Sequence, residues 1–138
     1  MITATEHTAP VDEQTSLFYR AWLPPNAQKA VVMVHRGHEH SGRLVDVVDE
    51  LALQETAVFA WDARGHGKSP GERGYAPSFS RVVKDLDVFV RYVSQQHGIA
   101  IEDEVTWPKG GKSIYFRDPS GNSAELVTPG VWGLPSGW

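Results

Sequence analysis

The sequence predicts an α/β fold, in which a partial parallel sheet with two helices is followed by an antiparallel β-hairpin tail. Short apolar runs at Ala30–Val34 and Thr56–Trp61 are typical of strands buried on both faces. A segment with helical spacing follows each run, and this strand–helix alternation is the signature of a parallel sheet. No helical period returns after about residue 100, so the sheet is not expected to continue in the same way.

The first predicted elements precede and connect these two strands. Ser16–Leu23 is rich in aromatic residues and is closed by Pro24-Pro25, which indicates a strand followed by a turn. Apolar residues recur at helical spacing between the two buried strands and predict a helix over Arg43–Gln54. A glycine-rich loop over Ala63–Pro77 follows the second buried strand.

The second helix has recognisable signals at both ends. Ser78 is a suitable N-cap, and Gly98 stands where a glycine commonly ends a helix. Between them the apolar residues form one stripe over about four turns. The stripe contains Val82, Val83, Leu86, Phe89, Val90 and Val93.

The remaining residues have a different character. Ser113–Arg117 and Ser123–Val127 indicate two strands, and the Asp118–Asn122 segment between them indicates a tight turn. The pattern therefore divides the chain into a polar lead-in (1–14), an α/β segment (15–102) and a hairpin with an irregular Gly/Pro-rich tail (103–138).

Composition excludes several classes of function. Of 138 residues, 41% are hydrophobic and 22% charged, as in a globular protein. The net charge of −4 and the lack of a dense Lys/Arg cluster argue against nucleic-acid binding. Cysteine is absent, so thiolate chemistry and Cys-based metal sites are excluded. No apolar run suggests a membrane span or a signal peptide, and we expect a cytoplasmic protein.

Three motif matches do not withstand inspection. Gly67–Gly71 fits G-x-S-x-G, but the residue after Ser69 is Pro70, which has no N–H to donate to an oxyanion. The segment also lies beyond the end of its strand and opens no helix. The two Gly-Lys-Ser sequences lack the earlier glycine of a phosphate loop. We therefore interpret Ser69 as part of a glycine-rich surface loop.

Two groups of polar residues leave alternatives open. His35, His38 and His40 lie beside Glu39 and could bind a metal, but we favour a polar loop at the carboxyl end of a parallel strand, where α/β sheets place ligand sites. The other group contains Asp62, Arg64, His66 and Ser69. It could form a local Ser–His–Asp relay, but we favour a structural role in which the Asp and Arg pair and fix the loop backbone.

Two segments resemble a known family. Residues 34–43 read VHRGHEHSGR, and residues 61–71 read WDARGHGKSPG. The first resembles the oxyanion loop of the α/β-hydrolase family, in its monoacylglycerol lipase and lysophospholipase (serine aminopeptidase S33-like) branch. The second resembles the Asp-x-Arg-Gly-His-Gly-x-Ser loop of the same branch. The resemblance covers about residues 15–102 and implies a hydrolase of small ester or lipid-like substrates that needs no cofactor.

The resemblance assigns roles to a few residues. His35, Arg36 and Gly37 form the oxyanion loop, and Asp62, Arg64 and His66 form the structural loop. Arg36 stands where the family has glycine, so the oxyanion donor is uncertain by one residue. The nucleophile elbow, the acid and the catalytic histidine come later in the family and are absent here. The implied protein is truncated, has no catalytic residue and is inactive alone.

The tail resembles a different superfamily. Residues 106–126 are similar to the last hairpin of a vicinal-oxygen-chelate (glyoxalase/bleomycin-resistance) domain, in which the residue at Glu125 commonly ligates a divalent metal. The two resemblances imply a join near residues 100–104. It is a natural fusion, a frame or assembly error in the sequence, or a deliberately engineered join. Alternative functions are a metal-dependent chelate-fold oligomer and a non-catalytic small α/β protein. An open sheet edge also predicts low stability or self-association.

Overall fold

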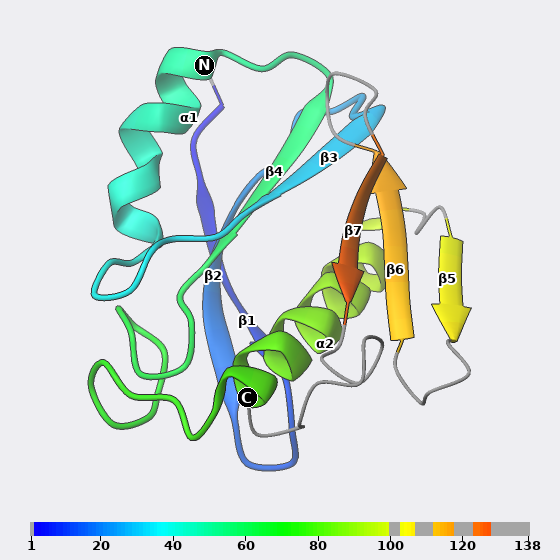
Figure 1. Ribbon diagram of the computed structural model, residues 1–138. Helices are drawn as coiled ribbons and strands as arrows, with labels where there is room; N and C mark the ends of the chain where they lie inside the picture. Colours follow the sequence, from blue (N-terminus) through cyan, green and yellow to red (C-terminus); the bar gives the residue numbers. More distant parts are fainter. Residues whose placement is uncertain (1, 100–102, 107–111, 118–122, 128–138) are drawn as a thin grey trace. The chain divides into compact units, whose positions relative to one another are not determined.

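The computed structural model describes residues 2–99, 103–106, 112–117 and 123–127, with side chains described for residues 2–99. It divides into two compact units, Met1–Tyr75 and Ala76–Trp138. The first contains a four-stranded sheet and a short helix, and the second contains a long helix and a three-stranded sheet (Figure 1). The elements in chain order are β1 (Thr5–Pro10), β2 (Ser16–Trp22), β3 (Lys29–Met33), η1 (Ser41–Leu44), α1 (Val45–Leu51), β4 (Thr56–Trp61), α2 (Phe79–His97), β5 (Asp103–Thr106), β6 (Lys112–Arg117) and β7 (Ser123–Val127).

The sheet of the first unit has the order β1-β2-β4-β3. β3 and β4 are parallel and are joined by a crossover through α1, whereas β2 is antiparallel to both β1 and β4. This confirms the predicted α/β class, but the sheet is mixed instead of parallel throughout. The short connection of residues 11–15 allows β1 and β2 to pair antiparallel, whereas the parallel β3–β4 pair needs its crossover through α1.

The polar lead-in predicted over residues 1–14 contains β1, which the sequence interpretation missed. β1 pairs with β2 from Thr5 opposite Ala21 to Pro10 opposite Ser16. Of its six residues only Ala9 is buried. An edge strand with one buried residue lacks the apolar alternation by which strands are recognised, so its pairing with β2 was not visible in the sequence.

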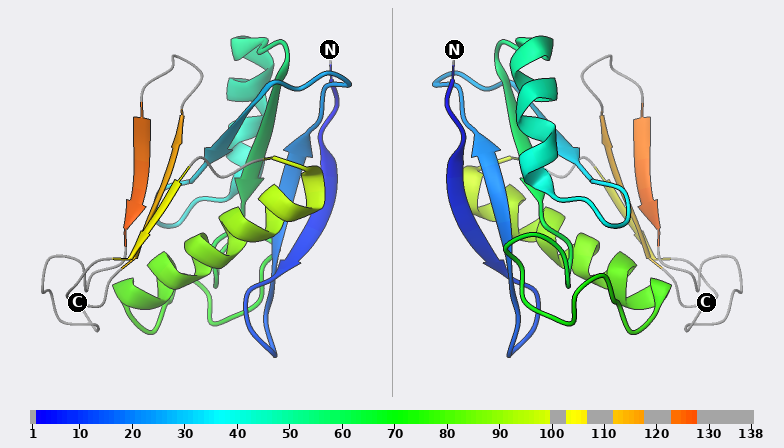
Figure 2. Two further views of the ribbon diagram at one scale, coloured as in Figure 1. Left: turned by 90° about the vertical axis from the view of Figure 1, so that its right-hand side faces the viewer. Right: turned by 90° about the vertical axis from the view of Figure 1, so that its left-hand side faces the viewer.

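The helix predicted over Arg43–Gln54 is shorter than expected. It begins with the 3₁₀ turn η1, continues as α1 over Val45–Leu51, and ends at Ala52, which has left-handed backbone angles (φ 46°, ψ 43°). Its buried residue Val48 packs against Trp22 and Val58 of the sheet. Figure 2 shows α1 beside the four-stranded sheet. Both faces of β4 are closed, since all six of its residues are buried.

The second unit begins with α2, whose ends lie where the sequence predicts them. Ser78 Oγ accepts a hydrogen bond from Arg81 N (3.1 Å), and Gly98 adopts φ 68°. The three-stranded sheet has the order β5-β6-β7, and its β6–β7 hairpin confirms the two predicted tail strands. β5 was not predicted. Neither described helix has the length and apolarity that a bilayer crossing requires.

Two expectations for the tail lie outside what the structure describes. Glu125 is a residue of β7 opposite Tyr115, but its side chain is not among those described. The irregular segment expected over residues 128–138 also lies outside the described residues.

Candidate functional site

The candidate site consists of the two loops that follow β3 and β4. Because these strands are parallel neighbours, their carboxyl ends meet at one edge of the sheet, which is where α/β sheets place ligand sites. The first loop contains His35, Arg36 and Gly37, and the second contains Asp62, Arg64 and His66. The fold thus brings both groups of sequence-predicted site residues together at one end of the first unit.

Asp62 connects the two loops through its buried carboxylate, which is 1% exposed. Oδ1 accepts a hydrogen bond from Ser41 N (2.6 Å), and Oδ2 accepts one from Lys68 N (2.8 Å). Hydrogen bonds to an ionised carboxylate are stronger than those between neutral groups. One side chain therefore holds the backbone of both loops.

His35 makes the second connection between the loops. Its Nε2 accepts a hydrogen bond from Ala63 N (3.0 Å), and its Nδ1 lies 2.7 Å from Arg36 O. A neutral imidazole with its proton on Nδ1 satisfies both contacts, because Nδ1 then donates and Nε2 accepts. The ring fixes the backbone immediately before Gly37, the expected oxyanion donor.

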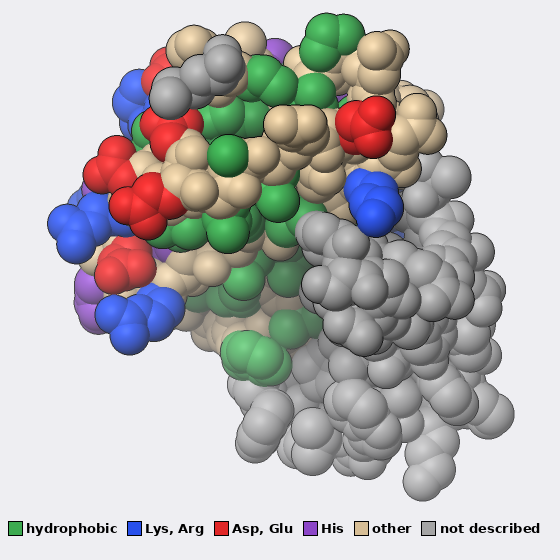
Figure 3. All heavy atoms as spheres, turned by 90° about the horizontal axis from the view of Figure 1, so that it is seen from above, with side chains coloured by type: hydrophobic (Ala, Val, Ile, Leu, Met, Phe, Trp, Pro, Cys, Tyr) green, Lys and Arg blue, Asp and Glu red, His purple; other side chains and the backbone are tan. Residues whose placement is uncertain are grey.

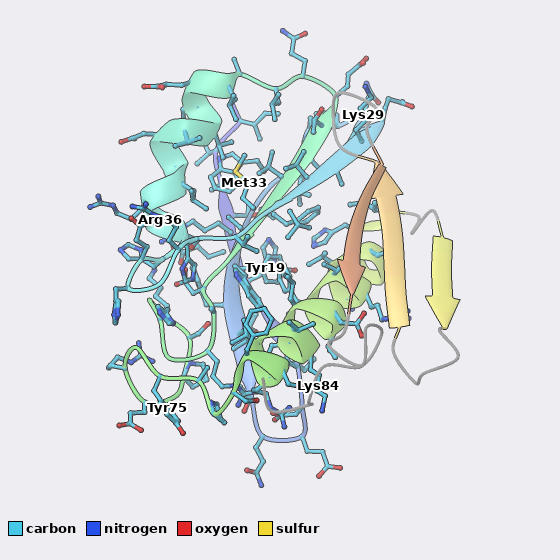
Figure 4. All side chains as sticks on the ribbon, viewed as in Figure 1. Tyr19, Lys29, Met33, Arg36, Tyr75 and Lys84 are labelled. Atoms are coloured by element: carbon cyan, nitrogen blue, oxygen red, sulfur yellow. The ribbon has the colours of Figure 1, made fainter. Side chains whose placement is uncertain are left out.

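Gly37 lies in open surroundings. A Cβ atom built at this position would have no neighbour within 4 Å. Within the part of the chain that the structure describes, no hydrogen bond takes up its N–H. The Arg36 side chain extends away from the fold (Figure 4), is 89% exposed, and lies 3.6 Å from Glu39. The backbone around Arg36 and Gly37 is therefore accessible to a small ligand.

The second loop is a close-packed structure in which glycine is required. Gly65 has φ 76°, and a Cβ there would lie 2.7 Å from Tyr75 O. Gly67 has φ 51°, and a Cβ there would collide with the Asp62 carboxylate. The Arg73 guanidinium donates to the carbonyls of Gly67 (2.8 Å), Ser69 and Gly71 (3.1 Å). The loop is thus pre-formed around Asp62.

Ser69, the serine of the G-x-S-x-G match, is 2% exposed and has backbone partners. Its Oγ donates to Asp62 O (2.5 Å) and accepts from Phe18 N (2.9 Å). These bonds join the second loop to β2. A nucleophile must expose its oxygen to substrate and face a base, and Ser69 does neither.

The histidines of the two loops lie close to one another without forming a metal site. The ring centroid of His66 lies 5.1 Å from the ring centroid of His35 and 6.3 Å from that of His38. Nδ1 of His66 lies 3.0 Å from Arg64 O. His40 Nδ1 instead accepts from Gly42 N (3.1 Å) at the start of η1. Among the residues for which side chains are described, no three His, Asp or Glu are arranged to hold a metal ion.

Ion pairs attach the second loop to the amino-terminal hairpin. Arg64 lies 3.0 Å from Asp12, and its guanidinium lowers the pKa of that carboxyl to about 2, with a contribution from Gln14 N. Lys68 lies 3.0 Å from Glu6, which also pairs with Arg20. Hydrogen bonds from Lys68 and then Arg20 lower the pKa of Glu6.

The sequence interpretation missed three supporting residues of the site. Ser41 contributes its backbone N–H, Arg73 its guanidinium and Asp12 its carboxylate, and each acts on a partner that the fold brings near. Arg73 lay within a recognised loop, but only the loop's conformation reveals its three carbonyl partners. Asp12 is 52 residues from Arg64 along the chain, and no sequence signal links them.

The fold is that of α/β hydrolases. A probable hydrolytic enzyme from Pseudomonas aeruginosa PAO1 aligns with a TM-score of 0.57 and 21% identity over 73% of this chain and 32% of that one. A soluble variant of monoglyceride lipase from Saccharomyces cerevisiae aligns with a TM-score of 0.53 and 21% identity over 66% and 31%. At such low identity these likenesses show the fold alone.

The sequence establishes the family. The model of the serine aminopeptidase, S33 family (Hydrolase_4) matches residues 25–121, more than half of the chain. The chain belongs to this family. The match continues past residue 102, where the sequence interpretation ends the hydrolase-like segment, and a chelate-like origin of the tail stays a prediction.

Relatives among known proteins include lipases. The chain is 54% identical over 102 residues to the uncharacterized protein YnbC of Escherichia coli, covering 72% of this chain and 17% of YnbC. It is 44% identical over 80 residues to human monoglyceride lipase, covering 57% of this chain and 24% of that one. It is 32% identical over 108 residues to monoacylglycerol lipase of Mycolicibacterium smegmatis, covering 78% and 36%. The chain thus spans between a sixth and about a third of each of these three relatives.

Proposed function

We propose that this chain supplies the oxyanion-loop part of a serine hydrolase that acts on small carboxylic or lipid-like esters. The observation that carries the proposal is the open backbone at Arg36 and Gly37. The His35 ring contacts Arg36 O and Ala63 N, and the Asp62 carboxylate accepts from Ser41 N later in the same loop. The reaction would be acyl transfer from the ester to a serine, followed by hydrolysis. A fixed backbone N–H would stabilise the oxyanion of the tetrahedral intermediate.

We further propose that these 138 residues are catalytically silent by themselves. The serine with the right local motif, Ser69, is buried and bonded to backbone atoms, and its following residue is Pro70. An oxyanion loop without a nucleophile retains only a small part of a serine hydrolase's rate enhancement. The relatives named as monoglyceride lipases suggest the substrate class.

Two assays test the silence of the chain. We expect 4-nitrophenyl butyrate to be hydrolysed at the buffer rate and a fluorophosphonate probe to label no residue. Ser69→Ala should leave both results unchanged, and Ser16→Ala is a matched control at an exposed serine. Labelling of a single hydroxyl, or activity lost in Ser69→Ala alone, would overturn the proposal.

A loop exchange tests the oxyanion role and identifies the donor. Residues Val34–Arg43 would replace the matching loop of human monoglyceride lipase, and we expect the chimera to hydrolyse esters. Within it, Gly37→Pro removes one N–H and should lower kcat by about 100-fold or more. Arg36→Pro tests the adjacent donor in the same way. A folded but inactive chimera, or full activity in both proline variants, would contradict the assignment.

A further inference from the structure

A cavity of about 510 Å³ opens in the first unit, away from the candidate site. Its walls come from the end of β2, the turn after it, the last part of α1 with its following loop, and the start of β4. The lining residues are Ile2, Trp22, Pro24, Pro25, Asn26, Val48, Asp49, Ala52, Leu53, Gln54, Glu55, Thr56 and Val58. β4 enters the cavity wall at Thr56 and reaches the candidate site after Trp61, so the two places lie roughly 17 Å apart along the strand.

The lining combines an apolar interior with charge of one sign. Trp22 and Val58 belong to the apolar core cluster, and Leu53 packs against that cluster. Among the described residues, the charged ones in the lining are Asp49 and Glu55, and none is Lys, Arg or His. Seen from above in Figure 3, hydrophobic side chains reach the surface at this end of the unit, with acidic side chains nearby. Such a lining attracts an apolar molecule with a positive group and disfavours an anion.

Backbone hydrogen bonds hold the loop that forms one wall. Glu55 O accepts from Gln28 N (2.7 Å) and Lys29 N (3.2 Å), and Ala52 N donates to Val48 O (3.2 Å). Ala52 and Glu55 adopt positive φ values of 46° and 56°, which residues other than glycine seldom do. Pockets that bind small molecules are usually pre-formed and of about this volume.

We infer that this cavity binds a small organic cation, a protonated amine on an aryl or alkyl body of roughly ten to fifteen non-hydrogen atoms. The apolar body contacts Trp22, Leu53 and Val58, and the ammonium group lies between Asp49 and Glu55. The carboxylate charge disfavours anions such as fatty acids. The cavity lies at the start of β4 and the ester site proposed above follows its end, so the two sites are separate and this inference does not depend on that proposal.

Three probes of one shape test the inference by NMR titration of the ¹⁵N-labelled chain. They are 4-phenylbutylamine, 4-phenylbutan-1-ol and 5-phenylpentanoate, which differ in charge. We expect the amine to shift the amides of residues 52–56 and the Trp22 indole N–H, with affinity in the order amine, alcohol, carboxylate. No saturable shift at these residues with the amine, or equal affinity for amine and alcohol, would overturn the inference.

Charge variants complete the test. Asp49→Asn and Glu55→Gln should each weaken binding of the amine by about three- to fivefold and leave the weaker binding of the alcohol unchanged. Asp46→Asn and Glu50→Gln are matched controls, because both acids lie on α1 but outside the lining. Equal losses in the control variants would show a general charge effect and refute a specific site. Spectra of the free variants report whether each is folded.

Discussion

Asp62 is the residue on which the geometry of the site depends most. Its buried carboxylate accepts from Ser41 N and Lys68 N (2.6 and 2.8 Å), one bond for each loop. Asp62→Ala leaves the buried Ser41 N–H and the part-buried Lys68 N–H without this partner, so we expect the free energy of unfolding to fall by about 2–4 kcal/mol. Asp62→Asn, which keeps one acceptor, should cost less. Urea unfolding measures both, and an unchanged midpoint for Asp62→Ala would contradict this account.

Ser69 has a structural role that its motif conceals. The hydroxyl donates to Asp62 O and accepts from Phe18 N, with 2% of the residue exposed. Ser69→Ala removes both bonds and leaves a buried N–H without a partner, so we expect a loss of about 1–3 kcal/mol. The control Ser16→Ala changes an exposed side chain and should shift the unfolding midpoint little.

Asp12 makes the stability sensitive to acid. Its pKa in the folded chain is about 2, below the ordinary value of 3.8, because Arg64 donates to it. Because this pKa is lower in the folded chain than in the unfolded chain, the ionised carboxyl stabilises the fold at pH values above about 4. This contribution is lost as the pH falls from about 4 towards 2. We expect Asp12→Asn to reduce the fall in Tm over this range. In Arg64→Gln, the carboxyl should titrate nearer 3.8 by NMR, and an unchanged midpoint would contradict the pairing.

At the scale of elements, α2 shows how far local signals determine a helix. Ser78 Oγ accepts from Arg81 N (3.1 Å), and Gly98 at φ 68° ends the helix. We expect Ser78→Ala and Gly98→Ala each to cost about 1 kcal/mol, because the first removes a cap and the second places a Cβ in the left-handed region. Circular dichroism during thermal unfolding measures the loss, with Lys84→Ala as an exposed control. If both variants unfold at the same temperature as the wild type, the two caps do not contribute to the stability of α2.

At the scale of the whole molecule, β3 is an edge strand of its described sheet. Its residues after Lys29 are all apolar and partly exposed. Apolar edge strands pair with other chains unless charge interrupts them. We expect the chain to self-associate with rising concentration, and Val32→Lys to reduce this, as sedimentation equilibrium would show. A monomer at all concentrations with a sharp, cooperative melt would contradict the expectation.

Sequence reasoning succeeded where the signal was local and failed where a partner was distant. The apolar runs predicted β3 and β4 to within one residue, and the capping residues predicted both ends of α2. Each of the two loop motifs was expected to follow a strand, and the loops follow β3 and β4. By contrast, β1 has one buried residue and becomes a strand only by pairing with β2. The shortening of the first helix to Leu51 was also not visible in its apolar spacing.

By itself the sequence determined the α/β class, the position of the two loops and both ends of α2, because strand burial and helix capping are properties of neighbouring residues. Only the tertiary structure decided that Ser69 bonds backbone, that Asp62 holds Ser41 and Lys68, and that Asp12 pairs with Arg64. These contacts join residues up to 52 positions apart, and no local pattern encodes which distant groups chain folding brings within hydrogen-bond distance.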